Sequence, residues 1–144
     1  MGFWGVGSFE NDAAAEWFLR VEEAPDPGAV MGAAIDDVLS AAEDPELDPS
    51  CEAIAAAELF ACCAGQLPER LPDSVNRWVQ ANSHGPHADE VAMAVQAVDR
   101  VRGMSELREL REAEDDCSQW LADIDDLLSR LARTSAGSPP SISP

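Results

Sequence analysis

Apolar residues recur every three or four positions along most of the chain, as they do in helices with one buried face. Strict alternation of apolar and polar residues, which is typical of half-buried strands, does not occur. The pattern therefore predicts an all-α protein of about six helices. We expect these helices over residues 11–22, 26–42, 48–65, 73–80, 86–103 and 105–133.

Residues typical of helix starts precede several of these segments. Asn11 or Ser8 suits the N-cap of the first helix, because either side chain can accept a bond from an unpaired backbone N–H. Asp26-Pro27 and Asp48-Pro49 each place an acidic cap before a proline, whose missing N–H is tolerated at the first helical position. The third helix is apolar on two faces, so we expect it to lie at the centre of the molecule.

The last expected helix, over residues 105–133, is the longest. Its leucines form a heptad-like apolar seam that Glu114 alone interrupts. A second apolar row beside the seam favours packing onto a globular core, and self-assembly through the seam is the alternative. That second row consists of Ala113, Trp120 and Leu127.

The chain ends in an uncharged segment, residues 134–144, that contains three prolines and shows no apolar period. Such a composition is typical of disorder. We therefore expect one compact helical domain over residues 1–133, followed by a disordered Ser/Pro tail.

Acidic residues dominate the charge of the chain. Twenty-eight acids against nine arginines, with no lysine, leave a formal charge of −19. This charge excludes binding to nucleic-acid phosphates and docking on an anionic membrane. The distribution is uneven: residues 1–66 hold fourteen acids and one arginine, whereas residues 67–144 hold fourteen acids and eight arginines.

An acidic field of this kind speeds association with a basic partner, although it can also serve solubility alone. We expect a non-catalytic module that docks on or masks a basic protein, with an immunity-like inhibitor as one concrete form. The docking residues that we predict are acids of the first three helices and their loops: Glu22, Glu23, Asp36, Asp37, Glu43 and Asp44.

Cysteine and histidine offer few signs of chemistry. The start of the chain lacks the features of a signal peptide, so we expect a cytoplasmic protein with reduced cysteines. No CxxC spacing occurs, and Cys51 and Cys62 fall on an apolar face, where cysteine acts as a small hydrophobe. We expect no cofactor and no catalytic residues. The alternative is a small hydrolase or metal-binding protein that uses His84, His87 and Asp89.

Two glycines, Gly5 and Gly7, precede the first helix but match neither the Rossmann nor the P-loop pattern. We interpret them as turn residues that let Trp4 and Phe9 enter the core, where both would pack with Trp17.

This opening segment resembles the start of a bacterial family known as domain of unknown function 4259. The resemblance extends over about residues 1–133 and implies an intracellular helical protein. It implies no established activity, cofactor or catalytic residue. The motif that carries the resemblance consists of Trp4, Gly5, Gly7, Phe9, Asn11, Asp12 and Trp17.

Overall fold

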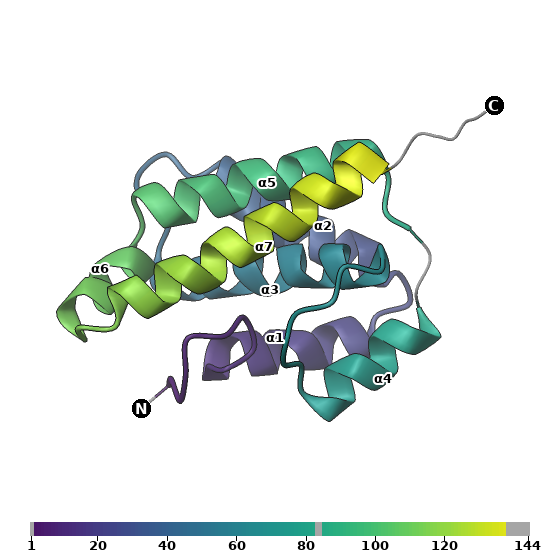
Figure 1. Cartoon of the computed structure of the whole chain (residues 1–144), viewed down its shortest axis with the longest axis horizontal. Helices are drawn as coiled ribbons and strands as arrows, with labels where there is room; N and C mark the ends of the chain where they lie inside the picture. The colour runs from purple at the N-terminus through teal and green to yellow at the C-terminus, as the bar shows by residue number, and fades with distance from the viewer. Residues whose placement is uncertain (1, 83–84, 138–144) are drawn as a thin grey trace.

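A computed structural model describes residues 2–82 and 85–137, with side chains up to residue 134. Within these residues the protein is all-α, with one isolated antiparallel bridge between Phe3 and Asn11. Figure 1 shows the helices packed into one compact body. Seven helices are present in the described part: α1 (Asp12–Glu23), α2 (Pro27–Leu39), α3 (Leu47–Cys63), α4 (Asp73–Ala81), α5 (Ala88–Gly103), α6 (Glu106–Ala113) and α7 (Cys117–Gly137).

Of the two residues predicted as N-cap of the first helix, Asn11 takes this position, and the predicted Asp26 cap of the second helix is confirmed. The Asn11 side chain accepts the Ala14 N–H at 2.8 Å. Asp26 accepts the Ala29 N–H at 3.3 Å, with proline at the start of α2. The third helix differs, because α3 begins at Leu47, before Asp48, and its N-cap residue makes no side-chain capping bond. Instead the Glu106 carboxylate, at the start of α6, accepts the Leu47 N–H at 3.1 Å.

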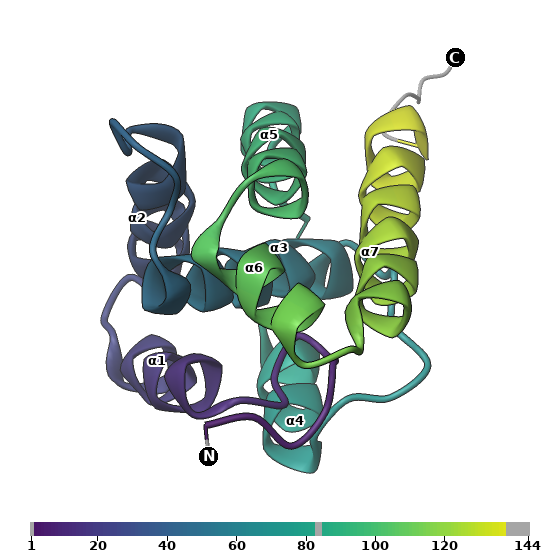
Figure 2. The ribbon, with the colours of Figure 1, turned by 90° about the vertical axis from the view of Figure 1, so that its left-hand side faces the viewer.

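Helix α3 lies at the centre, as its two apolar faces predict. It contacts all the other helices of the described part. Figure 2 shows α2, α5 and α7 on one side of α3, with α1 and α4 on the other. Small side chains let these neighbours approach closely from every direction. The fully buried alanines of α3 are Ala53, Ala55, Ala56, Ala57 and Ala61.

The expectation of one continuous helix over residues 105–133 is wrong. Helix α6 ends at Ala113, and Asp115 adopts a left-handed conformation with φ of 64° before α7 begins at Cys117. Asp tolerates this conformation better than most residues do. The Arg111 guanidinium binds Asp116 across the break at 2.8 Å. The heptad seam is therefore divided between two helices, and the interrupting Glu114 is the exposed C-cap of α6.

The second apolar row of that segment does pack into the core, since Trp120 and Leu127 are buried. Helix α7 continues to Gly137, four residues beyond the expected end at residue 133. The expected disordered tail therefore overlaps the helix over residues 134–137, and its remainder, residues 138–144, lies outside the described residues.

Candidate functional site

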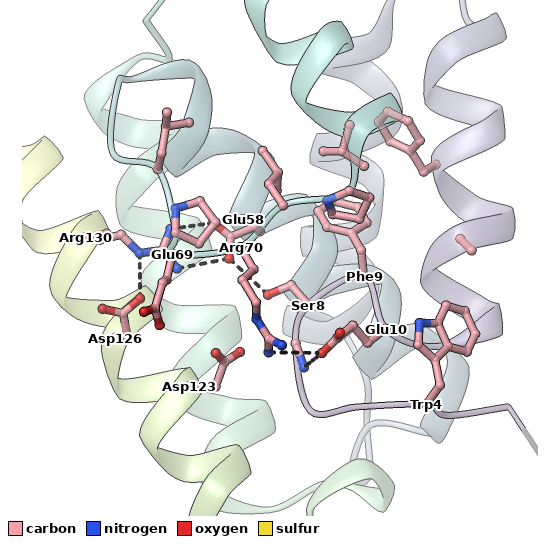
Figure 3. A pocket seen from close by; sticks show the side chains of 18 of the residues that line it. Trp4, Ser8, Phe9, Glu10, Glu58, Glu69, Arg70, Asp123, Asp126 and Arg130 are labelled. Carbon is pink, nitrogen blue, oxygen red and sulfur yellow. Dashed lines mark hydrogen bonds and ion pairs between the residues drawn. The ribbon is translucent and has the colours of Figure 1, made fainter.

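A cavity of about 820 Å³ opens where the amino-terminal segment and the α3–α4 connection meet α7. Figure 3 shows this cavity with α7 on one side and the amino-terminal loop on the other. Its lining combines apolar and charged side chains, which is typical of small-molecule sites. The apolar part includes Phe9, Phe18, Leu67, Leu71 and Val75.

A buried ion pair between Glu58 of α3 and Arg130 of α7 forms the floor of the cavity. Arg130 donates through Nη2 to Glu58 Oε1 at 3.0 Å and through Nη1 to Glu58 Oε2. Its remaining donors reach Asp126 Oδ2 at 2.8 Å and the Gln66 carbonyl at 3.1 Å. Burial lowers the pKa of Arg130, but the hydrogen bonds and charges of Glu58 and Asp126 outweigh burial and raise it overall. Arg130 therefore stays charged, and four of its five N–H donors have a partner.

Two further donors complete the environment of Glu58. The Ser8 hydroxyl donates to Glu58 Oε1 at 3.1 Å, and the Cys62 thiol donates to Oε2 at 3.5 Å. A carboxylate with this many donors is stable in the interior, because each oxygen lone pair lost from water finds a partner. The pair thus joins the amino-terminal segment, α3 and α7.

The amino-terminal segment folds around Glu10. The Glu10 carboxylate accepts the Gly7 N–H at 2.9 Å. A Cβ atom at Gly5 or Gly7 would lie 2.4 Å or 2.7 Å from Glu10 Oε1, so a side chain at either position would displace this carboxylate. The buried Arg111 of α6 also holds this loop, by donating to the Gly5 carbonyl at 2.8 Å.

The interpretation of these glycines is therefore corrected in part. Phe9 does enter the core, where it meets the edge of Phe18 at 5.7 Å between ring centroids, and Trp17 is also buried. Trp4 does not: its side chain is 60% exposed at the rim of the cavity. The backbone explains this difference, because the Trp4 N–H donates to the Glu10 carbonyl and pins Trp4 at the edge of the loop.

Asp123 of α7 also lines the cavity, and it makes no hydrogen bond or ion pair with the described residues. Its pKa is raised from 3.8 to about 6, chiefly by burial. The charges of Glu58, Asp126 and Glu10 contribute to this rise, and the charge of Arg130 opposes it. Asp123 is thus a carboxyl group without a counter-charge of its own.

Cys51 and Cys62 are buried, as predicted from their apolar surroundings, and all four cysteines are free. Burial raises the pKa of the Cys51 thiol to about 12 and that of Cys63 to about 11, and it raises the pKa of Cys62 as well. Thiols with such pKa values hold very little of the reactive thiolate at neutral pH.

The predicted docking acids lie apart from the cavity. All six side chains are exposed on α1, on α2 and in the loop that follows α2, and none forms an ion pair within residues 2–82 and 85–134. Asn11 and Asp12 serve the start of α1, as N-cap and first-turn acid respectively.

The residues of the metal-site alternative are only partly described. His87 is the exposed N-cap residue of α5, and its N–H donates to Glu90 at 2.8 Å. Asp89 is exposed in the first turn of the same helix, and His84 lies outside the described residues. Among the described side chains, no group of three or more His, Cys, Asp or Glu residues is arranged to hold a metal ion.

The principal cavity residues Glu58, Arg130, Asp126 and Asp123 were not predicted as a site. One local signal was available: Glu58 is a charged residue within an otherwise apolar stretch of α3, and a buried charge requires a partner. The sequence does not show which residue is that partner, because Arg130 lies 72 residues further along the chain.

In the described ranges, no helix is both long enough and apolar enough to cross a membrane. No curated protein and no solved structure matches the chain. The family profile described as Domain of unknown function (DUF4259) matches residues 2–123. This match includes the amino-terminal loop, α3 and most of the cavity, and the chain therefore belongs to the DUF4259 family.

Proposed function

We propose that the protein is a non-catalytic docking module that binds a basic protein through its acidic face. We define the acidic face as the exposed acids of residues 11–48, which extend over α1, α2 and the start of α3. The observation that carries the proposal is the imbalance in this stretch: eleven acids, all exposed, accompany a single arginine.

That single arginine does not neutralise the acidic face. Arg20 forms an ion pair with Glu52 of α3, with 3.3 Å between Arg20 Nη2 and Glu52 Oε2. Arg100, which reaches the loop after α2, donates to the Val38 and Glu43 carbonyl oxygens at 2.8 and 3.0 Å and, among the described side chains, to no carboxylate. The loop is therefore held in place while its acidic side chains, such as Asp44, keep their charge toward solvent.

The helices that carry the acidic face are packed into the core, and this packing lowers the entropy cost of binding. Val21 of α1 and Ile35 and Val38 of α2 are buried there. Charges fixed on packed helices attract a basic partner from a distance and orient it on arrival. A cationic enzyme whose basic cleft is covered by the acidic face is one partner of this kind.

A charge-neutralised variant tests the proposal. It carries Gln at Glu22, Glu23 and Glu43 and Asn at Asp36, Asp37 and Asp44. The matched control neutralises six exposed acids elsewhere: Asp73, Asp89, Asp99, Glu109, Glu114 and Asp115. Both variants have the same net charge, so a difference between them reports position and not total charge.

Immobilised wild-type protein and both variants are exposed to extract of the native host, and the retained proteins are identified. We expect basic proteins to be retained by the wild type and the control, and to be released as salt rises from about 0.05 M to about 0.5 M. Retention by the neutralised variant should fall on the order of tenfold or more. Equal retention by both variants, or binding that salt does not weaken, would refute the proposal.

A further inference from the structure

The cavity over the Glu58–Arg130 pair has features that docking at the acidic face does not use. Its volume of about 820 Å³ lies within the range of small-ligand sites, roughly 300 to 1,000 Å³. Its walls offer aromatic and aliphatic surface, and Trp4 stands largely exposed at the rim. A ligand with a hydrocarbon stem would find apolar contact here, and the Trp4 ring could also attract a cationic head group.

The charges that line the cavity do not cancel. Five carboxylates (Glu10, Glu58, Glu69, Asp123 and Asp126) face three arginines (Arg70, Arg130 and Arg133). Arg130 is hydrogen-bonded to the carboxylates of Glu58 and Asp126, and Arg133 donates to the Gln66 amide oxygen. Of the three arginines, this leaves Arg70, which pairs with Glu10 at 3.7 Å, while Asp123 forms an ion pair with none of the three.

Arg70 shows what kind of group the cavity attracts. In Figure 3 its side chain extends from the α3–α4 connection to Glu10. The contact is loose, with 3.7 Å between Arg70 Nη2 and Glu10 Oε1, and 75% of the Arg70 side chain is exposed. Exposed pairs of this kind contribute about 0 to 1 kcal/mol, so a competing cation can displace Arg70 at little cost.

We propose that this cavity binds an organic cation, a guanidinium or primary ammonium group on an apolar stem, with its head between Asp123 and Glu10 in place of Arg70. Anions are disfavoured by the excess of carboxylates. The same chemistry is carried by a free amine and by an arginine or lysine side chain of another protein. The inference does not depend on the acidic face, because none of the acids of that face lines the cavity.

The site should respond to pH. The groups that face Asp123 are Glu58 of α3, Asp126 and Arg130 of α7, and Glu10 of the amino-terminal segment. Because the pKa of Asp123 is raised to about 6, this carboxyl is charged at pH 7.5 and largely neutral at pH 5. Affinity for a cation should therefore fall as the pH is lowered through this range.

Calorimetric titration of the full chain with agmatine, at pH 7.5 and low salt, tests the proposal. We expect Asp123→Asn to weaken binding about tenfold, because one of the two carboxylate contacts loses its charge. Arg70→Ala should tighten binding by a fewfold, because the competing cation is gone. Asp37→Asn on α2 removes the same charge outside the cavity, so binding should be unchanged.

Further titrations separate the two ligand sources and control for charge. Butylurea has a head group of similar shape but lacks both positive charges of agmatine, the guanidinium and the ammonium, and should not bind. A capped Gly-Arg-Gly peptide that binds as well as agmatine would indicate a protein side chain as the natural ligand, whereas agmatine binding alone would indicate a free amine. Thermal melts of Asp123→Asn confirm that the variant is folded.

Two results would overturn the proposal. One is the absence of agmatine and peptide binding by both the wild type and Arg70→Ala up to about 10 mM. The other is equal affinity in Asp123→Asn and the wild type. The six-acid variant of the acidic face should bind agmatine as the wild type does, so failure of the cavity proposal and failure of the docking proposal are distinguishable.

Discussion

The acidic face and the Glu58–Arg130 pair use the same kinds of side chain for opposite purposes. On the acidic face, eleven exposed carboxylates accompany one arginine, and solvent screens their repulsion. At the pair, one carboxylate and one guanidinium are almost completely buried and saturated with hydrogen bonds. The comparison teaches that the location of a charge decides its role: the buried pair supports the fold, whereas the exposed acids are available to a partner.

The largest expected effect on stability comes from breaking the buried pair. Arg130→Met should lower the free energy of unfolding by about 3 to 5 kcal/mol, because Glu58 remains buried without its counter-charge. Urea denaturation measures this loss. The double variant Glu58→Leu/Arg130→Met should recover much of it, since it removes both charges together. A single variant that costs less than about 1 kcal/mol would show that Glu58 is already neutral or reaches water.

Removal of the unpaired cavity carboxyl should have a smaller effect, of opposite sign. The pKa of Asp123 in the folded protein, about 6, exceeds its ordinary value of 3.8, so the folded state binds the proton more tightly than the unfolded chain. The charged carboxyl therefore disfavours folding above pH 6, and this penalty disappears below about pH 4. The pKa difference corresponds to a free energy that solvent screening reduces. We therefore expect Asp123→Asn to stabilise the protein by about 1 to 2 kcal/mol at pH 7.5.

The measurement is urea denaturation of Asp123→Asn and the wild type at pH 7.5 and pH 4. The gain in unfolding free energy should shrink toward zero at the lower pH. A gain that is the same at both pH values would mean that shape, and not charge, explains the effect.

The glycines of the amino-terminal loop should contribute about 1 kcal/mol. Gly5→Ala brings a methyl group against the Glu10 carboxylate, which must turn away and give up its bond to the Gly7 N–H. Thermal unfolding of Gly5→Ala, alone and combined with Glu10→Ala, measures this loss. The penalty of Gly5→Ala should largely vanish in the Glu10→Ala background, and a penalty that persists there would point to backbone strain at Gly5.

The smallest expected effect on stability comes from the acidic face, although it has the most charges. Neutralising the six predicted docking acids should change the free energy of unfolding by no more than about 1 kcal/mol, and toward greater stability, because mutual repulsion is relieved. Urea denaturation of this variant checks the value. A loss of several kcal/mol would mean that these carboxylates hold the fold together, contrary to the comparison above.

Local features of the fold were readable from the sequence. Asn11 and Asp26 each cap a helix by accepting a backbone N–H only three residues away. The apolar stripes place Trp17 and Trp120 in the core. The break between α6 and α7 is not visible in the sequence, because the leucine spacing continues across Glu114. The turn itself depends on the left-handed Asp115 and on the ion pair between Arg111 and Asp116.

The cavity could not be predicted in the same way. It depends on contacts between segments far apart in the chain: Ser8 reaches Glu58 across 50 residues, and Arg130 reaches Glu58 across 72. The exposure of Trp4 was missed for the opposite reason. Its aromatic side chain suggests burial, but the loop that carries it is built around a carboxylate, that of Glu10.

The claim that the acidic face binds a basic partner is tested most directly by the salt dependence of affinity. The dissociation constant for a partner recovered from the host is measured at several salt concentrations, for the wild type, the six-acid variant and its matched control. Our account predicts that affinity falls steeply with salt in the wild type and the control, and that this dependence largely disappears in the six-acid variant. Equal slopes for all three proteins would contradict it.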